Sequence, residues 1–166
     1  PVQLLAVGCS RAGNRRLSAL SQACGCGLST RVRCSYEVLV RHLNSAKPQL
    51  GLVLLRDEYA GLGSPSKFMS YLRLGLPLLY IGPRGTNADV ACRQHGGGIA
   101  LTNRASREEF LEVCRTLNDS GRLAELHAGV RRAVSFFASQ NQDSLAWRVV
   151  DALTNADSAH GADGTV

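Results

Sequence analysis

The chain has 166 residues, 45% of them hydrophobic and only 5% aromatic, so aliphatic side chains must build its core. Lys and Arg outnumber Asp and Glu by 19 to 13, a formal net charge of +6, yet the arginines are scattered along the sequence. This balance favours anionic ligands such as phosphates and also suits an acidic membrane surface. It does not favour nucleic acid, because the sequence has neither an aromatic-rich surface for single strands nor a long basic run.

Metal, disulfide and membrane signals are weak. The six cysteines lie mostly within apolar stretches, which predicts reduced core thiols. Cys92 and His95 form a lone C-x-x-H, and no zinc site is expected. No stretch reaches the roughly 18 uninterrupted apolar residues of a membrane helix, and no signal-peptide pattern precedes the first apolar run. We expect a soluble, cytoplasmic domain, peripheral at most to the inner face of the membrane.

The first third of the sequence alternates apolar runs with segments of helical spacing. We expect strands at residues 3–7, 31–34 and 50–55, and helices at 14–24 and 36–46. In the first helix, Leu17, Leu20 and Ala23 are expected to face inward.

The remaining sequence continues this alternation and ends in helices. Ser64 and Pro65 mark a helix start and Gly75 its end, because serine caps helices and proline fits the first helical position. Strands are expected at 77–82 and 98–101, and helices at 86–95, 104–118, 120–139 and 142–153. The expected inward residues of the last helices are Phe110, Val113, Leu117, Leu123, Leu126, Val130, Val134 and Phe137.

Strands separated by helices of about ten residues predict right-handed crossovers and a parallel sheet covered on both faces. The predicted class is therefore α/β, a Rossmann-like doubly wound parallel sheet with C-terminal helices. We expect one domain over residues 1–153 and a flexible polar tail over 154–166. In such sheets ligands bind at the carboxyl ends of the strands, so the loops after the strands are the candidate site.

The loop AGLGSPSK has the composition of a phosphate site. Its glycines let a ligand approach the backbone, its helix start offers free amides, and Lys67 adds a cation. The alternative is that Ser64 and Pro65 only cap a helix while Lys67 is solvated.

The loop GPRGTN predicts a second phosphate site. Gly85, Thr86 and Asn87 open another helix, with Arg84 adjacent. Two helix starts on one edge of a sheet suit a diphosphate.

Other chemistries lack their motifs. Ser64 and Lys67 match the S-x-x-K of serine acyl-enzymes, but its partner motifs S-D-N and K-T-G are absent. The absence of G-x-G-x-x-G after the first strand and of a P-loop argues against a dehydrogenase and an NTPase. His42 and His127 lie on predicted helices, where surface or packing roles are more common than catalysis.

The segment SPSKFMSYLRLGLPLLYIGP, residues 64–83, carries a family resemblance. It is similar to the P-S-K-x-x-x-Y-L-x-x-G-x-P segment of retaining GT-B glycosyltransferases of glycosyltransferase family 4, the glycosyl transferases group 1. As in that family, a hydrophobic strand, a Gly-Pro, a Gly-Thr helix start and a glycine-rich turn (HGGGIAL) follow. The resemblance covers residues 2–153 and implies the C-terminal, nucleotide-sugar-binding half of a GT-B fold.

The resemblance implies a donor site for a nucleoside-diphosphate sugar, with protein donors stabilising the departing diphosphate and no metal or other cofactor. Residues 63–67 would face the diphosphate and sugar, and Ser35 and Tyr36 would lie near the base. It implies no catalytic residue in this chain. The implied substrate-binding residues are Gly8, Ser35, Tyr36, Gly63, Ser64, Pro65, Ser66, Lys67, Ser70, Gly85, Thr86 and Asn87.

Two departures from the family pattern shape the functional expectation. Ser70 stands where a glutamate usually holds the ribose, and Leu62 where many members have another glutamate. The family's first strand of this domain, whose loop carries an Arg and a Lys, and its acceptor half are absent from the sequence. We expect the donor-binding domain of a glycosyltransferase of polysaccharide or glycoconjugate synthesis, a fragment or subunit that is inactive without an acceptor-binding domain.

Two alternatives remain open. One is a non-catalytic Rossmann-like domain, degenerate at the donor site, that binds a protein partner. The other is a flavodoxin-like or regulator-like domain that binds a phosphate ligand, although the acidic cluster of such regulators is missing.

Overall fold

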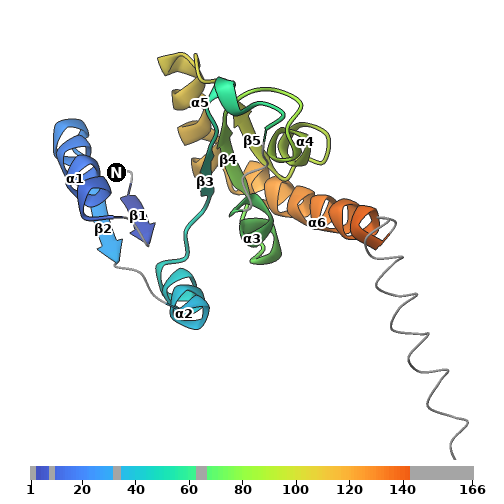
Figure 1. The fold of residues 1–166 in the computed structure, drawn as a ribbon, viewed down its shortest axis with the longest axis horizontal. Coiled ribbons are helices and arrows are strands. Elements are labelled where there is room, and N and C mark those ends of the chain that lie inside the picture. The colour runs from blue at the N-terminus through green and yellow to red at the C-terminus, as the bar shows by residue number, and fades with distance from the viewer. Residues whose placement is uncertain (1–2, 8–9, 32–34, 63–66, 143–166) are drawn as a thin grey trace, which may run out of the picture. The chain divides into compact units, whose positions relative to one another are not determined.

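The computed structural model describes residues 3–7, 10–31, 35–62 and 67–142, without the side chains of Tyr36, Asn141 and Gln142. The chain divides into two compact units, Pro1–Pro48 (unit 1) and Gln49–Val166 (unit 2). The predicted α/β class is confirmed, because the described part contains five strands, all paired in parallel, and six α-helices (Figure 1). The strands form two small sheets rather than one.

Unit 1 contains β1 (Gln3–Val7), α1 (Arg11–Cys24), β2 (Gly27–Arg31) and α2 (Tyr36–Ala46). β1 and β2 pair in parallel, from Gln3 opposite Gly27 to Val7 opposite Arg31. The strand predicted at 31–34 was placed to start too late, because β2 begins at Gly27. Gly25 ends α1 in the left-handed conformation, with φ at 63°, and the strand begins two residues later. Residues 32–34 lie outside the described part.

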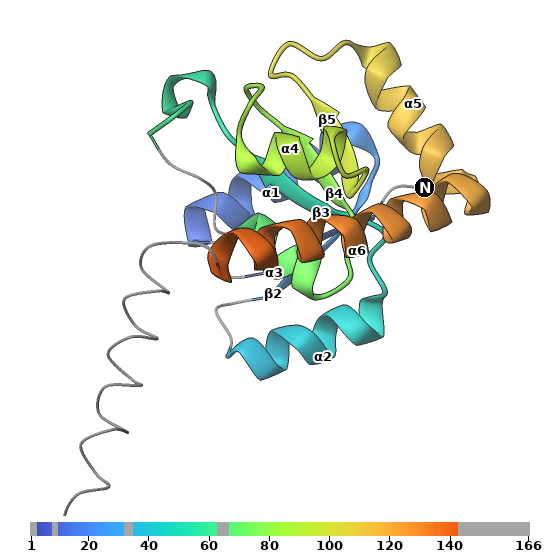
Figure 2. The same cartoon turned by 90° about the vertical axis from the view of Figure 1, so that its right-hand side faces the viewer.

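Unit 2 is built on a three-stranded parallel sheet of order β3–β4–β5. Its elements are β3 (Gly51–Leu54), the 3-10 turn η1 (Asp57–Tyr59), α3 (Lys67–Arg73), β4 (Leu78–Ile81), α4 (Asn87–Arg93), β5 (Gly98–Leu101), α5 (Arg107–Asn118) and α6 (Ser120–Gln142). Helices α3, α4 and α6 lie together on one face of this sheet, and α5 lies on the other (Figures 1 and 2). The expected helix at 142–153 falls outside the described residues.

The strands of unit 2 alternate between a buried and an open face. Val53, Leu78 and Tyr80 point toward α3, α4 and α6 and are at most 3% exposed. On the opposite face Leu52 and Leu54 are 46% and 62% exposed. The core also includes Phe68, Leu72, Ala88, Ala91, Cys92, Val130, Ala133 and Phe137.

The inward residues expected on the helices are only partly correct. Val113, Val130 and Phe137 are buried, as predicted. Leu20, Ala23 and Phe110 are exposed, so the prediction was wrong for these three. Helical spacing identifies an apolar face, but not whether another element covers its margins.

Close packing of α6 against the turn before β5 depends on glycine. A Cβ on Gly129 would overlap the backbone of Gly96 and lie 2.7 Å from the Gly97 nitrogen. The contact is completed by Arg132, whose Nε donates to the His95 carbonyl at 3.2 Å. The helix and the turn can approach this closely only without a side chain at position 129.

We predict that Gly129→Ala lowers the free energy of unfolding by about 1–3 kcal/mol, because the added methyl group forces α6 away from the turn. Urea denaturation of the purified chain measures this loss. Gly121→Ala is the matched control, since the atom nearest to a Cβ added at that position would be Asp119 Oδ1, at 3.3 Å. Equal stability of the two variants would contradict the packing argument.

Candidate functional site

The carboxyl ends of β3, β4 and β5 meet at one edge of the unit 2 sheet, because the strands are parallel. Backbone bonds extend the pairing beyond the strands. The Leu55 N–H donates to the Ile81 carbonyl, and the Gly82 N–H donates to the Leu101 carbonyl, each at 3.0 Å. The loops after all three strands therefore leave the sheet from a fixed frame, which we call the carboxyl edge.

Asn103, two residues after β5, connects this edge across the sheet. Its side-chain amide donates to the Leu55 carbonyl at 3.0 Å and to Asp57 Oδ1 at 2.8 Å. The loop after β5 is thus tied to the loop after β3, although 46 residues separate Asn103 from Asp57. This contact limits the positions available to both loops.

Tyr80 anchors the loop after β4 from below. The side chain is fully buried, and burial raises the pKa of its hydroxyl, so the group stays protonated. The hydroxyl donates to the Pro83 carbonyl at 3.0 Å and accepts a hydrogen bond from Thr86 Oγ1 at 2.9 Å. Position 82 must be glycine here, because a Cβ would lie 2.5 Å from this hydroxyl and 2.8 Å from the Leu55 carbonyl.

Asp89 completes the anchoring of the same loop. The residue is 6% exposed, and its carboxylate accepts from the Gly85 N–H at 2.9 Å and from Arg93 Nε at 2.8 Å. Arg93 also donates to the Ala100 carbonyl of β5 at 2.9 Å, and the Asp89 N–H donates to Thr86 Oγ1 at 3.2 Å. The Gly85 amide, expected to face a phosphate, is therefore bound to an anion supplied by the chain itself.

Positive charge without a partner remains at and beside the carboxyl edge. Arg84 and Arg104 lie in the loops after β4 and β5, and Lys67 begins α3; all three are exposed. Within the described residues none of them makes an ion pair. Arg56 differs, since it pairs with Glu58 at 3.5 Å and lies over the Tyr59 ring at 5.3 Å.

The predicted site residues fall into four groups. Gly85, Thr86 and Asn87 are at the carboxyl edge, where Thr86 caps α4 and Asn87 is exposed. Lys67 and Ser70 are exposed on α3, whereas Ser35 caps α2 in unit 1, accepting from the Val38 N–H at 3.4 Å, and Tyr36 begins that helix. Gly8, Gly63, Ser64, Pro65 and Ser66 lie outside the described residues.

Sequence reasoning missed Tyr80, Asp89, Arg93 and Asn103. Thr86 and Asp89 form the T-x-x-D pattern that precedes helices, so the capping interaction could have been predicted. Tyr80 looked like one more apolar strand residue, and Asn103 like a loop residue. Their partners are set by how the strands pair, which no short pattern contains.

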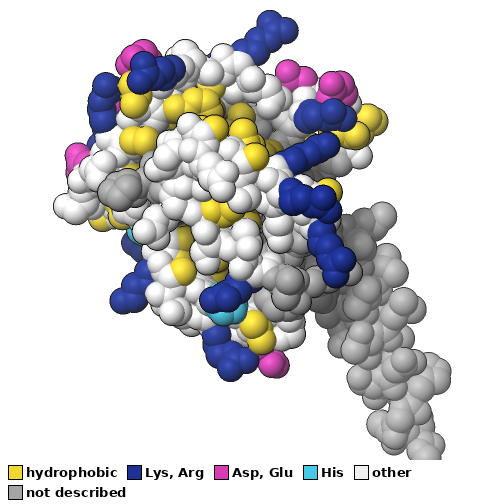
Figure 3. Space-filling view, turned by 90° about the vertical axis from the view of Figure 1, so that its left-hand side faces the viewer, with side chains coloured by type: hydrophobic (Ala, Val, Ile, Leu, Met, Phe, Trp, Pro, Cys, Tyr) yellow, Lys and Arg dark blue, Asp and Glu magenta, His cyan; other side chains and the backbone are white. Residues whose placement is uncertain are grey.

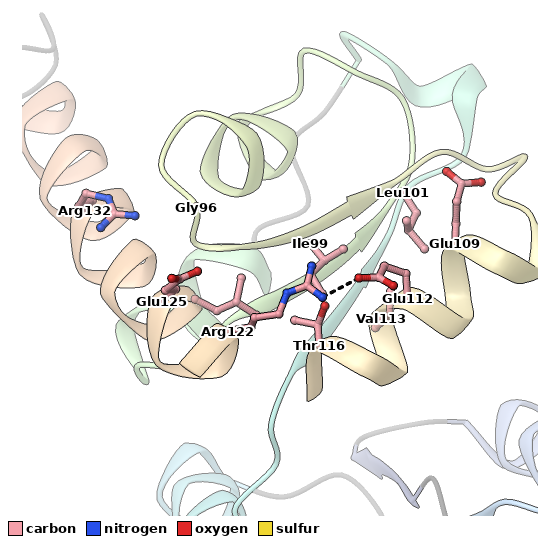
Figure 4. A pocket seen from close by; sticks show the side chains of 11 residues that line it. Gly96, Ile99, Leu101, Glu109, Glu112, Val113, Thr116, Arg122, Glu125 and Arg132 are labelled. Carbon is pink, nitrogen blue, oxygen red and sulfur yellow. Dashed lines mark hydrogen bonds and ion pairs between the residues drawn. The ribbon is translucent and has the colours of Figure 1, made fainter. Parts of the chain in front are cut away.

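A separate cavity of about 420 Å³ lies between β5, α5 and α6, away from the carboxyl-edge loops (Figure 4). Ile99, Leu101, Val113 and Leu126 line it with apolar surface. At its rim Arg122 Nη1 contacts Glu112 Oε1 at 2.6 Å, and hydrogen bonds from Arg122 and then Arg115 lower the pKa of the Glu112 carboxyl. This pair links α5 to α6, and Arg115 Nη1 donates to the other carboxylate oxygen, Glu112 Oε2, at 3.0 Å.

The described residues show neither a metal cluster nor a membrane-spanning helix. No group of three or more His, Cys, Asp or Glu in this part of the chain could hold a metal ion. No helix in the same part is long and apolar enough to cross a bilayer. Burial, followed by the nearby Asp89 charge, raises the pKa of the Cys92 thiol to about 12, so this thiol is a neutral core group.

Compared with known proteins, the chain matches no family model, no curated protein and no solved structure.

We predict that Asp89→Asn lowers the free energy of unfolding by about 1–3 kcal/mol, because the neutral amide loses the charged bond from Arg93. Chemical denaturation monitored by circular dichroism tests this. The control Glu108→Gln also removes one negative charge, but from a side chain that is 75% exposed and 4.0 Å from Arg115, and should change stability by about 0.5 kcal/mol or less. A loss no larger than the control's would show that Asp89 does not hold the loop.

Proposed function

We propose that this chain is the donor-binding domain of a glycosyltransferase and binds a nucleoside-diphosphate sugar at the carboxyl edge of the β3–β4–β5 sheet. The observation that carries the proposal is a set of exposed cations at and beside this edge, Arg84, Arg104 and Lys67, which make no ion pair within the described residues. The nearby carboxylates are already engaged: Asp57 by Asn103, Glu58 by Arg56, and Asp89 by Gly85 and Arg93. A diphosphate would supply the missing negative charge.

The hydrogen bonds of the loop after β4 indicate which of its groups would contact that diphosphate. The Gly85 amide is taken by Asp89, so this loop offers the Arg84 side chain rather than a free amide at position 85. The two phosphates would be held by the guanidinium groups of Arg84 and Arg104 and the ammonium group of Lys67, with no metal in the proposed role. The sequence resemblance, not the cation set, is what narrows the anion to a nucleotide sugar.

Glycosyl transfer would require an acceptor-binding domain or subunit beside this one. The chain is proposed to position the donor and stabilise the departing diphosphate, while the partner supplies the acceptor. The proposed location is the cytoplasm, at the inner face of the membrane, as expected for synthesis of a polysaccharide or glycoconjugate.

A second candidate is a non-catalytic Rossmann-like domain that binds a protein partner. The observation that favours it is Asp89, whose carboxylate occupies the amide where a phosphate would bind. Ser70 adds to this, because it is a short neutral residue at the position of the family's ribose-binding glutamate. The two candidates differ in whether nucleotide sugar binds at all.

We predict that UDP-, GDP- or dTDP-sugar binds the full chain and that Arg84→Ala weakens binding about tenfold, the effect of losing one charge-assisted hydrogen bond. Isothermal titration calorimetry gives the dissociation constants. Arg131→Ala is the control, because Arg131 is an exposed arginine on α6 and makes no ion pair within the described residues. No binding of any of the three nucleotide sugars at millimolar concentration would exclude the donor site.

Ser70→Glu separates the two candidate functions. If the donor site is retained, the new carboxylate should bind the ribose hydroxyls and tighten nucleotide-sugar binding about tenfold. Ser70 is exposed on α3, so the longer side chain can be accommodated. Ser70→Gln is the matched control for size. An unchanged dissociation constant in both variants would favour the protein-interaction domain.

A further inference from the structure

The net charge of the protein is concentrated in unit 1. Residues 1–48 contain seven Lys and Arg but a single acidic residue, Glu37, a formal charge of +6. Residues 49–166 contain twelve basic and twelve acidic residues and have no formal net charge. Unit 1 therefore accounts for the whole excess of positive charge, although the arginines look evenly scattered along the sequence.

The cations of unit 1 are directed to solvent. Every Lys and Arg in its described part is exposed, and none makes an ion pair with a described residue. These residues are Arg11, Arg15, Arg16, Arg31, Arg41 and Lys47. Lys and Arg side chains that project outward are visible in the space-filling view of Figure 3. Such a surface attracts a polyanion and gains from neutralisation.

Helix α1 combines this charge with exposed apolar surface. Arg11 and Arg15 are one helical turn apart and share a face. The adjacent face carries Arg16 and, one turn later, Leu20, which is 60% exposed. Leu4 on β1 is 36% exposed. The helix carries no acidic residue in its first turn. Arginines beside exposed leucine suit the boundary between lipid headgroups and acyl chains.

A lipid surface fits these residues better than nucleic acid does. Residues 1–48 contain no Phe or Trp and only one Tyr, so bases would find almost no aromatic surface to stack on. An exposed leucine gains nothing from a phosphate backbone but gains from burial in the headgroup region.

We propose that unit 1 docks this protein on an anionic bilayer through Arg11, Arg15, Arg16 and Leu20 of α1. Acidic lipid headgroups bind the arginines, and Leu20 inserts at the headgroup boundary. The surface is separate in sequence from the carboxyl edge of unit 2, and its occupation does not require nucleotide sugar.

Sedimentation of the full chain with vesicles tests the proposal. Phosphatidylcholine vesicles containing about 30% phosphatidylserine should bind the protein at about 50 mM salt, and pure phosphatidylcholine vesicles should not. The variant Arg11→Gln, Arg15→Gln, Arg16→Gln should bind on the order of 100-fold more weakly, since each cation contributes about fivefold. Leu20→Ser leaves the charge unchanged and should also weaken binding, because the apolar contact with the headgroup boundary is lost.

The matched control Arg73→Gln, Arg107→Gln, Arg131→Gln removes the same charge from exposed arginines of unit 2 that make no ion pair within the described residues. It should retain binding within about threefold if the unit 1 surface is responsible. Equal losses in the two triple variants, or no binding to phosphatidylserine vesicles, would overturn the proposal. Tighter binding to duplex RNA than to these vesicles would also overturn it and assign the surface to nucleic acid.

Discussion

The buried carboxylate of Asp89 is the contact on which the carboxyl edge of unit 2 depends. It holds the Gly85 amide on one side and the Arg93 guanidinium on the other, and Arg93 in turn binds the Ala100 carbonyl of β5. A loop, a helix and a strand are thereby joined by two paired side chains of α4, Asp89 and Arg93. Because charged hydrogen bonds of this kind are stronger in a partly dry site, the loop after β4 has little freedom to move.

Tyr80 and Asn103 extend the same constraint across the sheet. Tyr80 fixes Pro83 and Thr86 from within the core, while Asn103 fastens the loop after β5 to the loop after β3. The donors in these bonds are neutral side chains, and the Asp57 carboxylate accepts one of them. Arg84 and Arg104, which make no ion pair within the described residues, remain as positive charges in these anchored loops. A ligand that binds there would lose little free energy in ordering the loops themselves.

Elements set by local periodicity could be predicted from the sequence, whereas contacts between distant residues could not. The alternation of apolar runs and helical segments predicted the α/β class and most elements, because burial imposes those periods directly. The strand predicted at 31–34 was placed to start too late, because the left-handed turn at Gly25 lets the strand begin at Gly27. Leu20 and Phe110 lie at positions of the apolar helical spacing, but no other described element covers them, so they are exposed.

The candidate site was less accessible to sequence reasoning. The sequence identified Gly85 and Thr86 in the loop after β4, but their role in binding phosphate remains a prediction. It did not reveal that the Asp89 carboxylate accepts a hydrogen bond from the Gly85 amide, the group expected to bind phosphate. Asn103 and Asp57 meet only because parallel strands bring distant loops to one edge. The concentration of charge in unit 1 emerged only once the structure had divided the chain into two units.

Binding of a nucleotide-sugar diphosphate at the carboxyl edge of unit 2 is tested most directly by NMR. Backbone amide chemical shifts are measured during titration of the full chain with a UDP-, GDP- or dTDP-sugar. We expect the largest changes in the loops that contain Arg84 and Arg104 and at the start of α3. Changes confined to the cavity between β5, α5 and α6, or no changes at millimolar ligand, would contradict this binding site.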